Sequence, residues 1–123
     1  MPRYVLLRHD CPPALGAPSH WDLMLEFRGQ LRTWRIESLP SRDGRSARAL
    51  KLPDHRLAYL DYEGPLTGGR GAVTRVDTGE LAWIEPEPPR LVAQLTAGAL
   101  AGAMELTQID GPEWELRLTA PGP

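Results

Sequence analysis

The feature that most constrains this chain is the alternation of apolar and polar residues in short runs that glycine and proline separate. In residues 20–27 (HWDLMLEF) and 113–119 (EWELRLT), alternate side chains fall on opposite faces of an extended strand. Proline also breaks residues 10–19 (DCPPALGAPS), where no helix could continue. The sequence contains no convincing internal repeat or long amphipathic helix, so it predicts an all-β fold with little helix.

The expected strands follow one another at short intervals, with turn residues between them. Arg28-Gly29 and Asp110-Gly111 mark tight hairpin turns, and residues 53–64 form an ordered loop or a single helical turn. We expect strands at residues 3–9, 20–27, 30–37, 48–52, 71–77, 80–85, 91–96, 103–109 and 113–119. Many short strands of this kind indicate a barrel or a sandwich. We predict a small closed or partly closed β-barrel that forms one domain over residues 1–123.

Composition limits the classes of function. Hydrophobic residues make up 41% of the 123 residues and charged residues 24%, a balance typical of soluble globular proteins. No apolar run is long enough to span a membrane, and the first residues lack a signal-peptide pattern, so we expect a cytoplasmic monomer. The net charge of −2 gives no overall basic field, so any contact with nucleic acid must be local. The clustered arginines could bind phosphate or could form a solvated surface.

Three histidines stand out because each lies near a carboxylate in the sequence. They occur in the segments RHD, SHWD and PDH, as His9, His20 and His55. His20 and Asp22 are two residues apart on one strand, so their side chains lie on the same face. Imidazole and carboxylate together suit manganese, zinc or iron. If His9 ends a neighbouring strand, then a site of His9, His20 and Asp22 is geometrically possible.

Neither the cysteine nor the tryptophans are expected to take part in a functional site. Cys11 has no second thiol with which to form an internal disulfide or a zinc-type cluster, so we expect an incidental loop thiol. Each of the four tryptophans lies in an alternating strand, which favours packing in or at the rim of the core over stacking against a base.

Several motifs occur in a recognisable order along most of the chain. They are Arg8-His9, His20-x-Asp22-x-Met24-x-Glu26, Gly29-x-Leu31-x-x-Trp34, and Asp54-His55-x-x-x-Tyr59 with Asp61 and Glu63-Gly64. In this order they resemble the 3′-phosphoesterase domain that occurs at the N-terminus of bacterial DNA ligase D and as free-standing proteins. After about Gly71 the resemblance rests on the strand pattern more than on identities.

The resemblance implies a small manganese-dependent β-barrel enzyme, with zinc as the alternative metal, that trims 3′-phosphate and 3′-ribonucleotide ends during DNA end repair. By this resemblance His9, His20 and Asp22 would hold the metal, His55 would contact the scissile phosphate, and Tyr59 would support His55. Glu26 could orient a metal ligand, or it could be an exposed strand carboxylate. The implied partners are nucleic-acid 3′ ends and a DNA repair ligase or polymerase, and no membrane.

The chain departs from the family pattern at three basic positions. Met24 stands where the family has an arginine on the metal-facing side, which we expect to be exposed, and a thioether cannot pair with phosphate. Ser38 replaces a lysine, and Ala47 replaces another arginine. The metal ligands are thus retained while the phosphate contacts are depleted. The chain could be an active phosphoesterase, with compensation by Arg8, Arg35 or Arg48, or a degenerate relative that binds metal or nucleic-acid ends without turnover.

Overall fold

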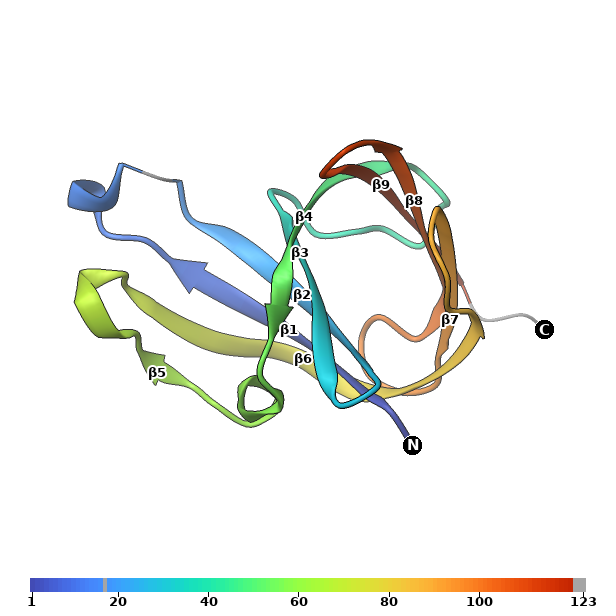
Figure 1. Cartoon of the computed structure of the whole chain (residues 1–123), viewed down its shortest axis with the longest axis horizontal. Helices are drawn as coiled ribbons and strands as arrows, with labels where there is room; N and C mark the ends of the chain where they lie inside the picture. The colour runs from blue at the N-terminus through green and yellow to red at the C-terminus, as the bar shows by residue number, and fades with distance from the viewer. Residues whose placement is uncertain (17, 121–123) are drawn as a thin grey trace.

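The computed structural model describes residues 1–16 and 18–120, and it contains a closed antiparallel β-barrel (Figure 1). Eight strands follow the order β1-β2-β3-β4-β9-β8-β7-β6, and β6 pairs with β1 to close the barrel. The strands are β1 (Arg3–Asp10), β2 (His20–Phe27), β3 (Gln30–Ile36), β4 (Ala47–His55), β6 (Ala72–Glu85), β7 (Arg90–Leu95), β8 (Gly102–Asp110) and β9 (Glu113–Thr119). The predicted all-β barrel is confirmed.

The remaining elements are short. A two-residue strand, β5 (Gly64–Pro65), pairs with β6, and three 3₁₀ turns occur: η1 (Pro13–Leu15), η2 (Leu57–Leu60) and η3 (Thr67–Gly69). The turn η2 is the single helical turn expected within residues 53–64. A helix with the length and apolarity to span a membrane is absent from the part of the chain that the structure describes.

Hairpin connections account for most of the barrel. Strands β1 to β4 form one meander and β6 to β9 form another, and only the β4–β9 and β1–β6 pairs join them. The β2–β3 turn places both Arg28 (φ 51°) and Gly29 (φ 82°) in the left-handed region, as a tight two-residue hairpin requires. This turn sets the register that brings Asp22 opposite Arg35, while the pairing of β1 with β2 brings His9 opposite His20.

Two predicted boundaries were wrong, both because strands pair over long distances in the sequence. The expected break at Gly79 does not occur: β6 is continuous, because its first part pairs with β1 and its last part with β7. A Cβ atom at Gly79 would lie 2.5 Å from the Ala97 carbonyl oxygen, so close backbone approach explains this glycine. Strand β4 also extends through the expected loop to His55, which pairs with Leu31.

The barrel interior forms the main hydrophobic core. Trp34 and Trp114 are buried there and meet edge to face, with ring centroids 5.5 Å apart. Trp21 and Trp83 are partly buried and pack against the same cluster. The predicted packing of all four tryptophans in or beside the core is confirmed.

A second apolar cluster lies on the opposite face of the strands, outside the barrel. Tyr4 and Leu6 point into the barrel while Val5 and Leu7 point outward, because side chains alternate along β1. The turn η2 covers this outer face. The cluster consists of Val5, Leu7, Met24, Leu31, Leu60 and Val73, with Tyr59 and Leu66 packed against it.

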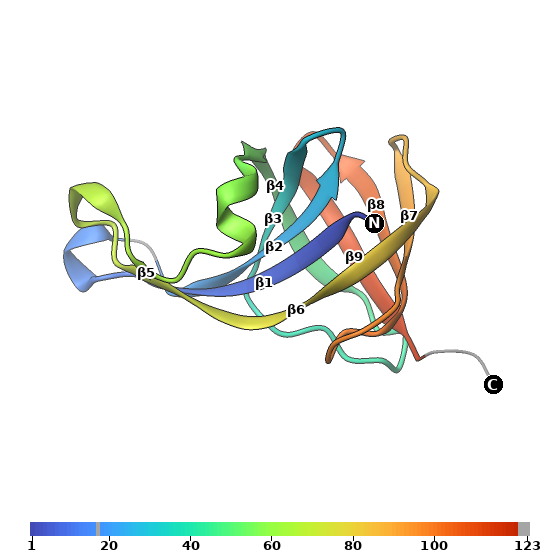
Figure 2. The ribbon, with the colours of Figure 1, turned by 90° about the horizontal axis from the view of Figure 1, so that it is seen from below.

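Strands β1, β2 and β6 project past the barrel at one end. Figures 1 and 2 both show the connection with η1 and the connection with η3 side by side at this end. The outer face of β1 and β2 is therefore flanked by these two connections and by η2. The histidines lie on this face.

Candidate metal and phosphate site

A cavity of about 230 Å³ opens on the outer face of β1 and β2, beside the second apolar cluster. Apolar side chains of that cluster, including Leu7, Met24 and Val73, form part of its wall. Its polar lining consists of His9, Cys11, His20, Asp22, Arg35, His55, Tyr59 and Arg70. Apart from Glu26, every metal-binding or catalytic residue proposed from the sequence therefore borders one cavity.

The β1–β2 ladder brings the two metal-type histidines together. His9 and His20 are directly paired in the register, and their rings meet edge to face with centroids 4.7 Å apart. Asp22 lies one pleat further along β2, on the same face as His20, and is paired with Leu7. Sequence alternation thus placed His20 beside Asp22, and strand pairing added His9.

Backbone carbonyls fix which nitrogen of each imidazole carries a proton. Nε2 of His9 lies 2.7 Å from the Arg70 carbonyl oxygen, and Nδ1 of His20 lies 3.1 Å from the Pro18 carbonyl oxygen. A carbonyl oxygen only accepts, so these two nitrogens donate. The other nitrogens, Nδ1 of His9 and Nε2 of His20, then have free lone pairs, which is the arrangement of metal-ligating histidines.

Both of these nitrogens face the Asp22 carboxylate. His9 Nδ1 is 3.8 Å from Asp22 Oδ2, and His20 Nε2 is 3.2 Å from Asp22 Oδ1. The Asp22 side chain is only 9% exposed, and Oδ1 has no hydrogen-bond partner among the described residues despite the short distance to His20.

The three groups fit a divalent metal ion. Two nitrogen lone pairs and a carboxylate that face one another are stable together when a proton or a metal cation lies among them, and burial strengthens that requirement. Two imidazoles and one carboxylate form a donor set that suits manganese, zinc or iron. His9, His20 and Asp22 could therefore hold such an ion together.

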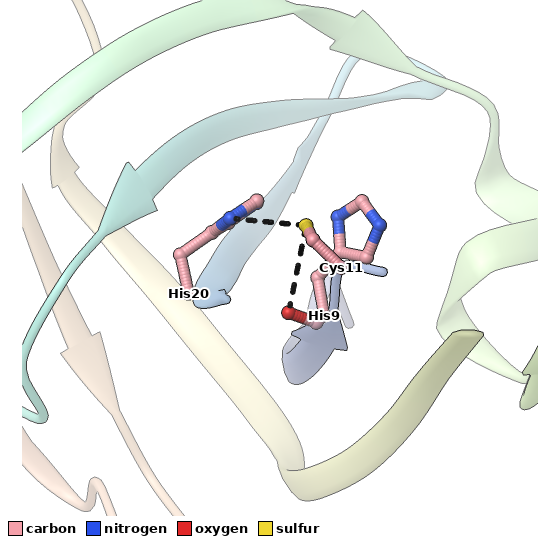
Figure 3. Close-up of side chains that lie close together, drawn as sticks. All are labelled: His9, Cys11 and His20. Carbon is pink, nitrogen blue, oxygen red and sulfur yellow. Dashed lines mark hydrogen bonds between the residues drawn. The ribbon is translucent and has the colours of Figure 1, made fainter. Parts of the chain in front are cut away.

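Cys11 lies in the same cluster, which the sequence analysis did not expect. Its Sγ atom is 3.9 Å from His20 Nδ1 and 4.0 Å from the His9 carbonyl oxygen (Figure 3). One ligand atom from each of His9, Cys11 and His20 lies within 4.8 Å of the others, so this His-Cys-His cluster could also hold a metal.

Two overlapping donor sets thus share His9 and His20. They differ in direction: Nδ1 of His9 and Nε2 of His20 face Asp22, whereas Cys11 approaches Nδ1 of His20, which donates to the Pro18 carbonyl oxygen. A sequence signal for Cys11 did exist. It follows His9 by two residues, the spacing that places two strand side chains on one face.

His55 and Tyr59 enter the cavity from the end of β4 and from η2. Nδ1 of His55 lies 2.9 Å from the Pro53 carbonyl oxygen and donates to it, which leaves Nε2 with a free lone pair when the ring is neutral. The rings of His55 and Tyr59 meet edge to face with centroids 5.6 Å apart. The extension of β4 to His55 brings this pair to the cavity, which a free loop would not guarantee.

Arg35 supplies positive charge at the cavity wall. It is paired with Asp22 in the β2–β3 register and is half-buried. Its only hydrogen bond among the described residues is a long contact of 3.4 Å from Nη2 to the Pro18 carbonyl oxygen. Most of its donors are therefore available to an anion in the cavity.

The other two arginines considered from the sequence lie elsewhere. Arg8 stacks over the Trp21 ring, 4.4 Å from its centroid, and pairs with Asp10 at 3.1 Å. Arg48 is paired with both carboxylate oxygens of Glu113 at 3.1 and 3.0 Å. Of these three arginines, only Arg35 lines the cavity.

Glu26 and Met24 lie differently from expectation. Glu26 is four residues from Asp22 along β2, about 13 Å away, where Oε1 accepts the Arg3 backbone N–H at 2.9 Å. The structure does not bring it to the cavity. Met24, expected on an exposed face, is 1% exposed because η2 covers that face. Ser38 and Ala47 do not line the cavity.

The fold and the cavity together define a class of protein: a small closed β-barrel with a candidate metal and phosphate site on its outer surface. The DNA ligase D 3′-phosphoesterase domain family matches residues 9–117, and the chain belongs to this family. The resemblance seen in the motifs is therefore confirmed. The family supports a phosphoesterase role in end processing and is metal-dependent.

One relative is the multifunctional non-homologous end joining protein LigD of Pseudomonas aeruginosa. It is 32% identical to this chain over 118 residues, which cover 93% of the chain. The chain spans only 13% of the length of that relative. The similarity thus concerns one portion of a much longer multifunctional protein.

Proposed function

We propose that this chain is a divalent-metal-dependent phosphoesterase that removes 3′-phosphate or 3′-ribonucleotide ends from nucleic acid during DNA end repair. The observation that supports this function is the meeting of two groups of residues in one cavity. His9, His20 and Asp22 form the metal side, and His55, Tyr59 and Arg35 form the phosphate side. Family membership supplies the reaction class.

The metal would be held by His9 Nδ1, His20 Nε2 and the Asp22 carboxylate. A bound divalent ion supplies Lewis acidity and offsets negative charge on a phosphoryl group. The protein contributes orientation, since the carbonyls of Arg70 and Pro18 hold the two imidazoles with their lone pairs toward Asp22.

The residues of the phosphate side would assist hydrolysis of the phosphate ester. Water attacks phosphorus, the bond from phosphorus to the 3′ oxygen breaks, and the leaving oxygen takes a proton. His55 is suited to donate that proton from Nε2 as an imidazolium, because Nδ1 is already directed at Pro53. Arg35 is suited to bind non-bridging oxygens, where charge develops. Tyr59 packs against His55 and positions its ring.

Manganese is the metal that the family resemblance implies. Cys11 is the specific observation that favours zinc, because a thiolate near the two imidazoles is a softer ligand than manganese prefers. Met24 is the observation that favours the second candidate function, a relative that binds metal or nucleic-acid ends without turnover, since the family has an arginine at this position.

The test is incubation of the protein with a 3′-phosphate primer-template and manganese or zinc, with release of inorganic phosphate as the measurement. His20→Ala and Asp22→Ala should lose both metal binding by calorimetry and turnover. His55→Ala should lose turnover while it still binds metal. A wild type that binds metal but releases no phosphate would support the binding-only alternative, and unchanged metal affinity in Asp22→Ala would refute the ligand assignment.

A further inference from the structure

A second hollow adjoins the site cavity. It has a volume of about 430 Å³ and shares Tyr59, Leu66 and Arg70 with the cavity, so the two are neighbours. The smaller cavity, about 230 Å³, has room for a metal ion and a phosphate but not also for the strand attached to that phosphate. A neighbouring hollow could therefore receive the next part of a bound strand.

Two other hollows also border the site cavity, and their charge suits a strand less well. The hollow that shares Arg35 contains Glu37 and Glu113. The Glu113 carboxylate forms an ion pair with the Arg48 guanidinium, with Oε2 and Nη2 3.0 Å apart. The hollow that shares His55 contains Asp54, which pairs with Lys51 at 3.3 Å, and it borders Arg56 from another side but has no second arginine and no exposed aromatic ring. Both present carboxylates where a nucleic-acid backbone would bring phosphates.

The larger hollow offers aromatic surface instead. Tyr62 is 37% exposed, and its ring meets that of Tyr59 edge to face with centroids 6.1 Å apart. Tyr59 in turn contacts His55 in the same way. A row of three rings thus runs from the phosphate side of the site into the larger hollow.

The larger hollow also offers free positive charge. Arg56 is exposed, and its side chain makes no hydrogen bond or ion pair within residues 1–16 and 18–120. Arg70 gives two of its five donors to Thr67. The acidic residue here, Asp61, pairs with Arg3 at 3.0 Å, and that guanidinium holds the pKa of Asp61 below its usual value.

We propose that this hollow, the Tyr62 groove lined by Arg56, Tyr59, Tyr62, Leu66 and Arg70, binds the terminal nucleoside of a strand whose 3′-phosphate lies in the site cavity. The base lies against Tyr62, and Arg56 contacts the next phosphate of the backbone. The inference rests on the proposed function. It makes the substrate a nucleic-acid strand end rather than a small free phosphomonoester.

The test measures binding in the metal-loaded protein with His55→Ala as background, so that the strand is not consumed. The probes are a short fluorescent single strand that ends in a 3′-phosphate and, separately, inorganic phosphate. Tyr62→Ala should weaken strand binding about tenfold, whereas Tyr62→Phe, which keeps the ring but loses the hydroxyl contact with Pro65, should bind nearly as well. Neither change should alter the affinity for inorganic phosphate.

Salt dependence tests the arginine. Arg56→Gln should reduce the slope of log affinity against log salt by about 0.7, the value of one single-strand phosphate contact. Arg48→Gln, an exposed arginine in another hollow, is the matched control and should leave the slope unchanged. Strand binding no tighter than phosphate binding, or an equal effect of the two arginine variants, would overturn the Tyr62 groove. Failure of the metal-loaded protein to bind either probe would overturn the proposed function itself.

Discussion

Replacement of Arg35 tests whether this arginine takes over the phosphate contact that the chain lost at Met24. Arg35 is paired with Asp22 across β2 and β3 and lines the cavity. A guanidinium about 5 Å from a unit negative charge contributes about 3 kcal/mol at an effective dielectric constant of 20. If that charge develops in the transition state, then Arg35→Ala should lower kcat about a hundredfold.

The structure also predicts what Arg35→Ala should leave unchanged. Among residues 1–16 and 18–120 its side chain makes a single hydrogen bond, the 3.4 Å contact with Pro18, so the free energy of unfolding should change by no more than about 0.5 kcal/mol. Metal affinity should stay equal or rise, because a positive charge next to Asp22 is removed. Turnover of a 3′-phosphate primer-template, calorimetric metal titration and urea unfolding measure these three quantities.

The matched control is Arg48→Ala, which removes an exposed arginine that is paired with Glu113 and does not line the site cavity. It should leave turnover unchanged. Arg35→Lys should recover part of the activity, since it restores charge but not the two-pronged geometry. Full activity in Arg35→Ala, or a loss of activity that follows a loss of metal or of stability, would refute the role given to Arg35.

Three further predictions concern Met24, Cys11 and Tyr4. Met24→Arg should lower the free energy of unfolding by several kcal/mol in urea titrations, because it introduces a charge at a position that is 1% exposed. The control Met24→Leu should lower it by less than about 1.5 kcal/mol. Equal stability of the two variants would contradict this prediction. Cys11→Ser should shift the metal preference from zinc toward manganese in competition calorimetry. It should also remove any sulfur-to-metal charge-transfer absorption of the cobalt-loaded protein. Identical absorption spectra of the cobalt-loaded wild type and variant would place Cys11 outside the ligand set. Burial and the hydrogen bond to Asp77 raise the pKa of Tyr4 above its usual 10.0, so the folded state keeps this proton while the unfolded chain loses it. Stability should therefore be complete below pH 10 and fall as the pH rises further, and Tyr4→Phe should show a shallower fall.

The sequence determined the properties that depend on local alternation. Strand periodicity and turn residues predicted nearly every strand, and the two-residue spacing of His20 and Asp22 predicted that they share a face. The ordered motifs predicted the family. These properties could be predicted because a strand's alternation and a hairpin's turn are set within a few neighbouring residues.

Only the tertiary structure decided what the outer face of the barrel contacts. Alternation places Met24 with His20 and Asp22, but it cannot say that η2 packs over this face and buries Met24, so that all three residues border one cavity. Likewise, no local pattern chooses Arg35 over the other arginines. That choice follows from the β2–β3 register, which sets Arg35 opposite Asp22.

The same reason explains Cys11 and β6. The proximity of Cys11 to His20 depends on the β1–β2 pairing, and the continuity of β6 through Gly79 depends on pairing with β1 and β7. Such contacts join residues far apart in the chain, and their stability comes from closing the barrel and burying its core. Local sequence patterns give no measure of that free energy. The arrangement of the site could therefore be seen only in the closed fold.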